Sequence, residues 1–61
     1  MAQRVTVHWD HGDAYEGEWL EQSQMPDGHG VYSYADGGWY EGQWKLGERH
    51  GHGREYRSQD L

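Results

Sequence analysis

The chain has 61 residues and therefore forms at most one small domain. It contains no cysteine, which excludes a disulfide framework, and its formal net charge of -6 disfavours nucleic-acid binding, which requires basic side chains against the phosphates. The sequence shows no signal peptide and no apolar run long enough to cross a membrane, which favours a cytoplasmic location.

The first two predicted strands form a hairpin. Residues 5–9 (VTVHW) alternate between apolar and polar side chains, and residues 15–19 (YEGEW) place Tyr, Gly and Trp on one face and two Glu on the other. Alternation with a period of two is typical of a half-buried strand, so we expect strands near residues 4–9 and 14–20. The glycine-containing segment at residues 11–13 predicts the turn between them.

The second hairpin repeats the first. YEGEW returns as YEGQW 25 residues later (15 to 40), after the alternating segment GVYSY at residues 30–34 and a turn at residues 36–38. We therefore expect strands near residues 29–35 and 38–45. The Gly-His-Gly motif returns after 23 residues (28 to 51), so the first connecting loop contains a two-residue insertion.

A third unit begins near the end of the sequence and stays incomplete. We expect a strand near residues 52–57, in which Glu55 and Arg57 occupy the positions of Tyr32 and Tyr34 in the preceding unit.

The expected fold is all-β: an open, single-layer antiparallel sheet of about five strands, built from stacked β-hairpins. No segment has helical periodicity. A single domain would span residues 1–61, divided into a half unit (4–12), a repeat (13–37) and a truncated repeat (38–57).

The strand register can be predicted from the turns. A three-residue turn closed by a left-handed glycine at residues 36–38 places Tyr34 opposite Tyr40 and Tyr32 opposite Gly42. The first hairpin would then place Trp9 opposite Tyr15, Val7 opposite Gly17 and Val5 opposite Trp19. In this register each strand glycine faces a large side chain, whereas a two-residue turn would place Ser33 opposite Tyr40 and lose that complementarity. The predicted structural glycines are Gly17, Gly30, Gly37, Gly42 and Gly53.

The repeated segments resemble the MORN repeat (membrane occupation and recognition nexus). The resemblance rests on residues 15–19, 28–37 (GHGVYSYADG) and 40–53 (YEGQWKLGERHGHG) and covers roughly residues 12–53. It departs from the family pattern in the longer first loop, which lacks the usual Gly-Lys-rich turn, and in the polar third unit.

The resemblance implies an elongated sheet that serves in protein interaction and assembly beside other domains. Some members bind extended or helical peptides along an aromatic groove. The family name suggests phospholipid binding, but this chain matches that property poorly because it has few basic residues: Arg4, Lys45, Arg49, Arg54 and Arg57.

An aromatic stripe is the candidate binding site. The chain has four Trp and five Tyr, and each ring can bury about 150–250 Å². The stripe is either the hydrophobic layer of the sheet or a groove for a partner, since a single-layer sheet leaves exposed rings that mark an interface. Its residues are Trp9, Tyr15, Trp19, Tyr32, Tyr34, Tyr40 and Trp44.

Other chemistry has weaker support. His50 and His52 share a strand face and could bind a metal, but histidines between glycines are more simply solvated strand residues. The carboxylates of Glu16, Glu18 and Glu41 lie on the polar face, where nothing would raise a pKa. No motif for a nucleophile or a phosphate loop is present, so we expect no catalytic residue, no metal and no cofactor.

The predicted function is a non-enzymatic protein-interaction or assembly module that presents an aromatic sheet face to a protein partner or to a second copy. The basic residues near the end, Arg49, Arg54 and Arg57, could meet the acidic part of another copy or could simply protect an edge strand. Two units are few for a stable array, so we expect a homo-oligomer or a longer array. The alternatives are a phospholipid-headgroup module and a regulatory segment of a larger enzyme.

Overall fold

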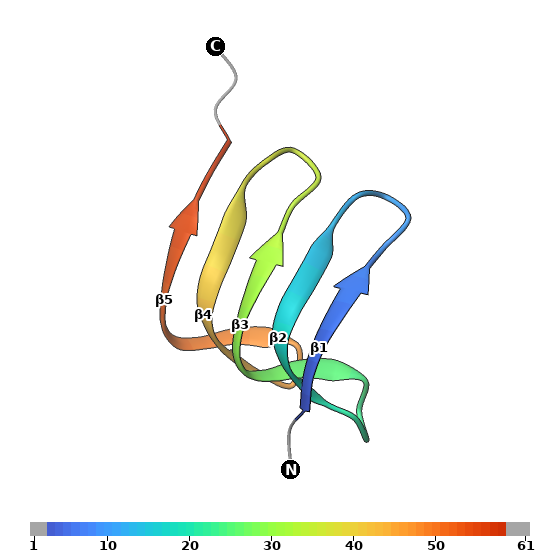
Figure 1. The fold of residues 1–61 in the computed structure, drawn as a ribbon. Coiled ribbons are helices and arrows are strands. Elements are labelled where there is room, and N and C mark those ends of the chain that lie inside the picture. The colour runs from blue at the N-terminus through green and yellow to red at the C-terminus, as the bar shows by residue number, and fades with distance from the viewer. Residues whose placement is uncertain (1–2, 59–61) are drawn as a thin grey trace.

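The computed structural model describes residues 3–58 and confirms the predicted class, a single antiparallel sheet of five strands in the order β1-β2-β3-β4-β5 (Figure 1). The strands are β1 (Gln3–His8), β2 (Ala14–Leu20), β3 (Met25–Ser33), β4 (Trp39–Lys45) and β5 (Glu48–Tyr56). Strands β3 and β5 begin about four residues earlier than the sequence predicted, because the loops before them are short.

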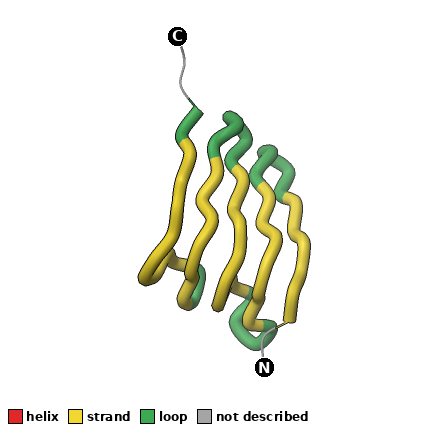
Figure 2. The backbone as a smooth tube through the Cα atoms, turned by 60° about the vertical axis from the view of Figure 1, so that its left-hand side comes forward, coloured by secondary structure: helices red, strands yellow, loops and turns green. Residues whose placement is uncertain are grey.

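The sheet has a single layer. Its principal extents are 42 × 27 × 14 Å, and Figure 2 shows that residues 3–58 form strands and turns with no element stacked on either face. Two packed sheets would be separated by about 10 Å before their outer side chains are counted, so the thinnest dimension fits one sheet with its side chains. Within residues 3–58 there is no helix that could cross a membrane.

The two turns at the upper end of Figure 1 join β1 to β2 and β3 to β4. Tyr34 N–H donates to Gly38 O (2.8 Å) and Gly37 N–H donates to Tyr34 O (3.0 Å), so the second turn comprises residues 35–37. The first turn comprises residues 10–12, with the equivalent pair of bonds. The left-handed glycines, Gly12 and Gly37 (φ +107° and +102°), each hold the third position of their turn.

The predicted register is wrong by two residues. Tyr40 lies opposite Tyr32 rather than Tyr34, and Tyr15 lies opposite Val7 rather than Trp9. The turn length was predicted correctly, but the turn begins one residue earlier because the left-handed glycine must occupy its last position and not its middle one.

A row of glycines crosses the sheet as a result. Gly17 pairs with Gly30, Gly30 with Gly42, and Gly42 with Gly53. The prediction that each strand glycine faces a large side chain directly is therefore wrong. The rings cover the glycines diagonally instead: a Cβ at Gly30 would overlap the ring and hydroxyl of Tyr15, and a Cβ at Gly53 would overlap those of Tyr40.

The lower end of the sheet bends. Irregularities in pairing follow Gly17 in β2 and Gly42 in β4, and the facing strands turn at Gly28 and Gly51, where φ is +105° and +65°. Figure 1 shows the first parts of β3 and β5 running across the lower end of the sheet before the strands turn upward. Glycine allows this bend because it adopts positive φ without steric cost. A larger residue would also not fit, because the side chains of Glu18 and Gln43 occupy the space where its Cβ would lie.

The loops at this end account for the different repeat spacings. Residues 21–24 join β2 to β3, whereas the turn between β4 and β5 has two residues, Leu46 and Gly47. The short turn is anchored to β3, because Gly47 N–H donates to Pro26 O (2.9 Å) and Leu46 N–H to Asp27 Oδ2 (3.2 Å).

Candidate functional site

All seven predicted stripe residues lie on one face of the sheet, but burial divides them. Tyr15, Tyr40 and Trp44 are 0%, 5% and 8% exposed and form the core. The Tyr15 hydroxyl donates to Glu18 O (2.6 Å), and Trp44 Nε1 donates to Gly30 O (3.2 Å). These three rings therefore serve as the hydrophobic layer of the sheet.

The core rings pack edge to face. The ring centroid of Trp44 lies 5.8 Å from that of Tyr15 and 5.2 Å from that of Tyr40, with interplanar angles of 87° and 88°. Edge-to-face pairs stabilise beyond the area that they bury. Burial also raises the pKa of Tyr15 to about 12, because the charged phenolate would lose its water.

The other four stripe residues are half-buried and form the candidate binding surface. Trp9 stacks on Tyr32 with ring centroids 5.5 Å apart, and Tyr32 lies 5.0 Å from Tyr34. Trp19 lies apart from this row, against Tyr15 at 6.0 Å. We define the aromatic row as Trp9, Tyr32 and Tyr34.

The carboxylate of Asp13 holds one part of the aromatic row in place. It accepts bonds from the Tyr32 hydroxyl and the Ala35 N–H, both 2.8 Å long, and His11 Nε2 lies 3.0 Å from it. The bond from Tyr32, followed by the bond from Ala35, lowers the pKa of Asp13. Burial and this carboxylate together raise the pKa of Tyr32 to about 12. Asp13, next to the first upper turn, is thereby hydrogen-bonded to Ala35 in the second upper turn.

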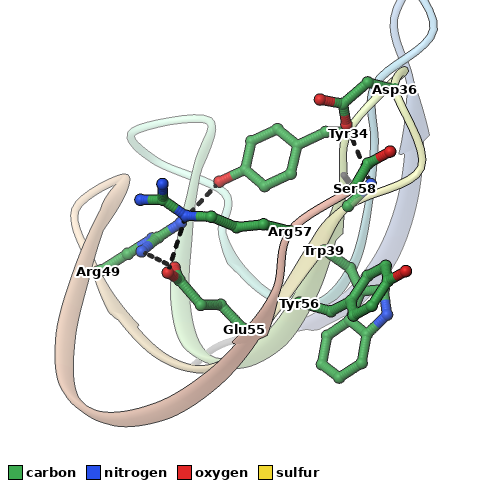
Figure 3. Close-up of a pocket in the computed structure, with 9 residues that line it drawn as sticks. Tyr34, Asp36, Trp39, Arg49, Glu55, Tyr56, Arg57 and Ser58 are labelled. Atoms are coloured by element: carbon green, nitrogen blue, oxygen red, sulfur yellow. Dashed lines mark hydrogen bonds and ion pairs between the residues drawn. The ribbon is translucent and has the colours of Figure 1, made fainter. Parts of the chain in front are cut away.

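Arg49 on β5 holds the other part. Its guanidinium lies 4.4 Å from the ring centroid of Tyr40, donates to the Tyr34 hydroxyl (2.9 Å) and pairs with Glu55 Oε1 at 2.5 Å. Figure 3 shows Tyr34, Arg49 and Glu55 meeting at the edge of the sheet, with Arg57 reaching the same carboxylate. The bonds from Arg49 lower the pKa of Glu55 and fix its side chain.

The sequence analysis missed a second aromatic cluster, Trp39 and Tyr56. These residues pair across β4 and β5 on the opposite face, with stacked rings whose centroids lie 6.2 Å apart. Figure 3 shows them side by side. Trp39 directly precedes the stripe residue Tyr40 in β4, and Tyr56 lies between Glu55 and Arg57, which occupy stripe positions of the third unit. Strand alternation therefore places both rings on the other face, and that was the available signal. Tyr56 is 54% exposed.

The histidines do not assemble into a metal site in the part of the chain that the structure describes. No group of three or more His, Asp or Glu side chains within residues 3–58 is arranged to hold a metal ion. His50 and His52 are exposed, and His29 lies 3.8 Å from Glu41. The side chains of Glu16 and Glu41 lie on the face opposite the core.

Comparison with known proteins assigns the chain to a family. No curated protein matches the chain. The family model of the MORN repeat matches residues 25–39 and 40–60, more than half of the chain. The repeats of this family are generally non-catalytic modules that often bind protein or membrane. The matched residues include the second Tyr-Glu-Gly-x-Trp segment, the glycines Gly30, Gly42 and Gly53, and the core rings Tyr40 and Trp44. The chain belongs to the MORN-repeat family.

Proposed function

We propose that this chain is a non-enzymatic protein-interaction module that binds an extended protein segment across the aromatic row. The observation that carries the proposal is the half-buried state of Trp9, Tyr32 and Tyr34 on a sheet with no second layer over it within residues 3–58. Tyr and Trp are enriched among the residues that dominate binding free energy.

The row is organised before any partner binds. The hydroxyls of Tyr32 and Tyr34 are already bonded to Asp13 and Arg49, so their rings are held in one orientation. A partner would not have to order these side chains, a step that costs about 0.5–1.5 kcal/mol for each flexible side chain.

A hollow beside the row favours an apolar side chain from the partner. It is lined by Tyr32, Tyr34, Trp44, Gly47, Glu48 and Arg49. Its lining thus combines aromatic rings with two charged side chains, as interaction sites commonly do. An extended segment would lay one side chain in this hollow and continue along the rings toward Trp9.

The charges favour a protein over an anionic lipid surface. Arg49 and Arg57 pair with Glu55, and Arg54 pairs with Glu41, so three of the five basic side chains already have carboxylate partners. Anionic lipids attract clusters of unneutralised basic residues. A cytoplasmic location, a role within a larger enzyme and the division of the chain into a half unit and two repeats stay predictions.

The test is a selection of binding peptides from a random library, followed by titration of the selected peptides with variants. Trp9→Ala and Tyr34→Ala should each weaken binding by about 2 kcal/mol or more, the range of a binding hot spot. Trp39→Ala is the matched control, because it removes a ring from the opposite face. Equal weakening by Trp39→Ala, or selection of no peptide that depends on Trp9 and Tyr34, would refute the proposal. Tyr34→Phe keeps the ring but loses the bond to Arg49, so it should weaken binding less than Tyr34→Ala; an equal loss in the two variants would contradict a role for the ring itself.

A further inference from the structure

The β5 edge of the sheet is open. Strand β5 pairs with β4 on one side, and no strand within residues 3–58 lies on its other side. Every residue of β5 is exposed. An open edge of this kind is a template for pairing with another strand.

The hydrogen bonds of the upper turn show which backbone groups of β5 point outward. Tyr34 and Gly38 form a hydrogen-bonded pair, and such pairs alternate along an antiparallel ladder. Trp39 therefore directs its backbone toward β5 and bonds with Tyr56. Gly53 and Glu55 consequently direct their N–H and C=O groups away from β4, toward the open edge, and Arg57, the residue directly after β5, would do the same if it continued the strand.

We propose that a second copy of this chain pairs antiparallel with β5 around a two-fold axis at Tyr56. In that register Glu55 lies opposite Arg57 of the second copy, and Arg57 lies opposite its Glu55. Both pairs are at positions whose backbone groups point outward, so ladder bonds and opposite charges coincide.

The side chains on the two faces suit this arrangement. Arg49 already holds Glu55 on the core face, and Arg57, which is 82% exposed and lies 3.4 Å from Glu55 of its own chain, could exchange that contact for Glu55 of the second copy. On the opposite face the two Tyr56 rings would meet at the axis, each stacked on its own Trp39. A directly opposed pair that is not hydrogen-bonded brings side chains closest together, which favours an aromatic pair at this position.

The neighbouring registers and the other edge are less favourable. An axis at Glu55 or at Arg57 would oppose like charges, and like charges directly opposite each other destabilise a sheet. At the β1 edge, pairing around Thr6 would place Arg4 opposite His8 of the second copy, with no acidic partner on that strand. Self-pairing is therefore specific to β5.

Sedimentation velocity over a range of concentrations tests the proposal. Pairing over a few residues gives an interface at the small end of the known range, below about 1,200 Å², so we expect a weak dimer that grows with concentration. Glu55→Arg and Arg57→Glu should each reduce association by at least about tenfold, because two attractive pairs become two repulsive ones. The double variant E55R/R57E should restore it.

Arg54→Glu is the matched control for Arg57→Glu, because it makes the same charge change on the opposite face of β5 and should leave association unchanged. Circular dichroism of each variant confirms that the sheet remains folded. Amide hydrogen exchange should show Glu55 and Arg57 becoming protected as concentration rises, while Arg4 and Thr6 do not.

Three results would overturn the proposal. The chain could remain a monomer at the highest soluble concentration, or the double variant could fail to restore the dimer. The dimer could also depend on Trp9 and Tyr34 and ignore the charge reversals, which would assign self-association to the aromatic row. The edge contact and the peptide-binding function use different residues, so either can fail while the other stands.

Discussion

Replacement of Gly30 by alanine is the sharpest test of how this sheet is packed. The new methyl group would overlap the ring and hydroxyl of Tyr15, which crosses the sheet diagonally above Gly30. Tyr15 is fully buried, with Trp19 and Trp44 against it, so its ring has no free space into which it can move. Either the ring is expelled or β2 and β3 separate.

The structure sets the size of the effect. Overpacking costs about 1–3 kcal/mol where the neighbours can adjust, and loss of a buried aromatic ring costs about 3–5 kcal/mol. The immobile Tyr15 places Gly30→Ala in the upper range. A domain of this size has a total stability of about 3–9 kcal/mol, at about 0.05–0.15 kcal/mol per residue. Gly30→Ala should therefore remove at least about a third of the total stability.

The internal repeat supplies a matched control. Gly53 has the same relation to Tyr40 that Gly30 has to Tyr15, but Gly53 lies on β5, which is bonded on one side and can shift. Gly53→Ala should cost about 1–3 kcal/mol, the range of relieved overpacking. Urea unfolding followed by Trp fluorescence measures both. A Gly30→Ala variant within about 0.5 kcal/mol of the wild type, the usual range for a surface substitution, would refute the reasoning, as would a larger loss at Gly53.

Two further predictions concern a turn and a carboxylate. Leu46 has φ +50° and is 52% exposed. The left-handed conformation costs about 1–2 kcal/mol for most residues and less for Asn, so Leu46→Asn should raise the free energy of unfolding by up to that amount. A lower melting temperature would contradict this, and Leu46→Ala is the control. The lowered pKa of Asp13 contributes stability above its unfolded value of 3.8, and that contribution is lost as the pH falls through the folded value. Asp13→Asn should thus be less stable than the wild type at pH 7 and should lose less stability on acidification. Urea midpoints at neutral and acidic pH measure both effects. An equal loss of stability on acidification in the two proteins would show that Asp13 has no such role.

The sequence was sufficient to predict the architecture but not the register. Alternation in residues 15–19 and 40–44 identifies strands, and the glycine-containing turns identify hairpins. The register was wrong because Gly12 and Gly37 can occupy either the middle or the last position of a three-residue turn. These two turns begin one residue apart in the sequence. Each strand pairing then moves by two residues, and that shift keeps every side chain on its own face. For this reason the seven stripe residues share one face even though their direct partners differ from the predicted ones.

The sequence did not predict which rings of the stripe are buried and which are half exposed. Tyr15 and Tyr40 occupy equivalent positions and are both buried, but Trp44 is buried while Trp19 is half exposed, although both end a Tyr-Glu-Gly-x-Trp segment. Trp44 sits between the rings of Tyr15, Tyr32 and Tyr40, whereas Trp19 lies near the β1 edge of the sheet. Burial depends on how many neighbouring units flank a ring, and a local motif does not contain that information.

The amino-acid sequence alone determined that this chain forms repeated hairpins with one aromatic face, because period-two alternation and glycine spacing act between near neighbours. Only the tertiary structure decided which rings form the core and which remain available, because that depends on contacts between repeats. It also aligned Gly17, Gly30, Gly42 and Gly53 across four strands, since a row of close backbone contacts exists only when the whole sheet is assembled.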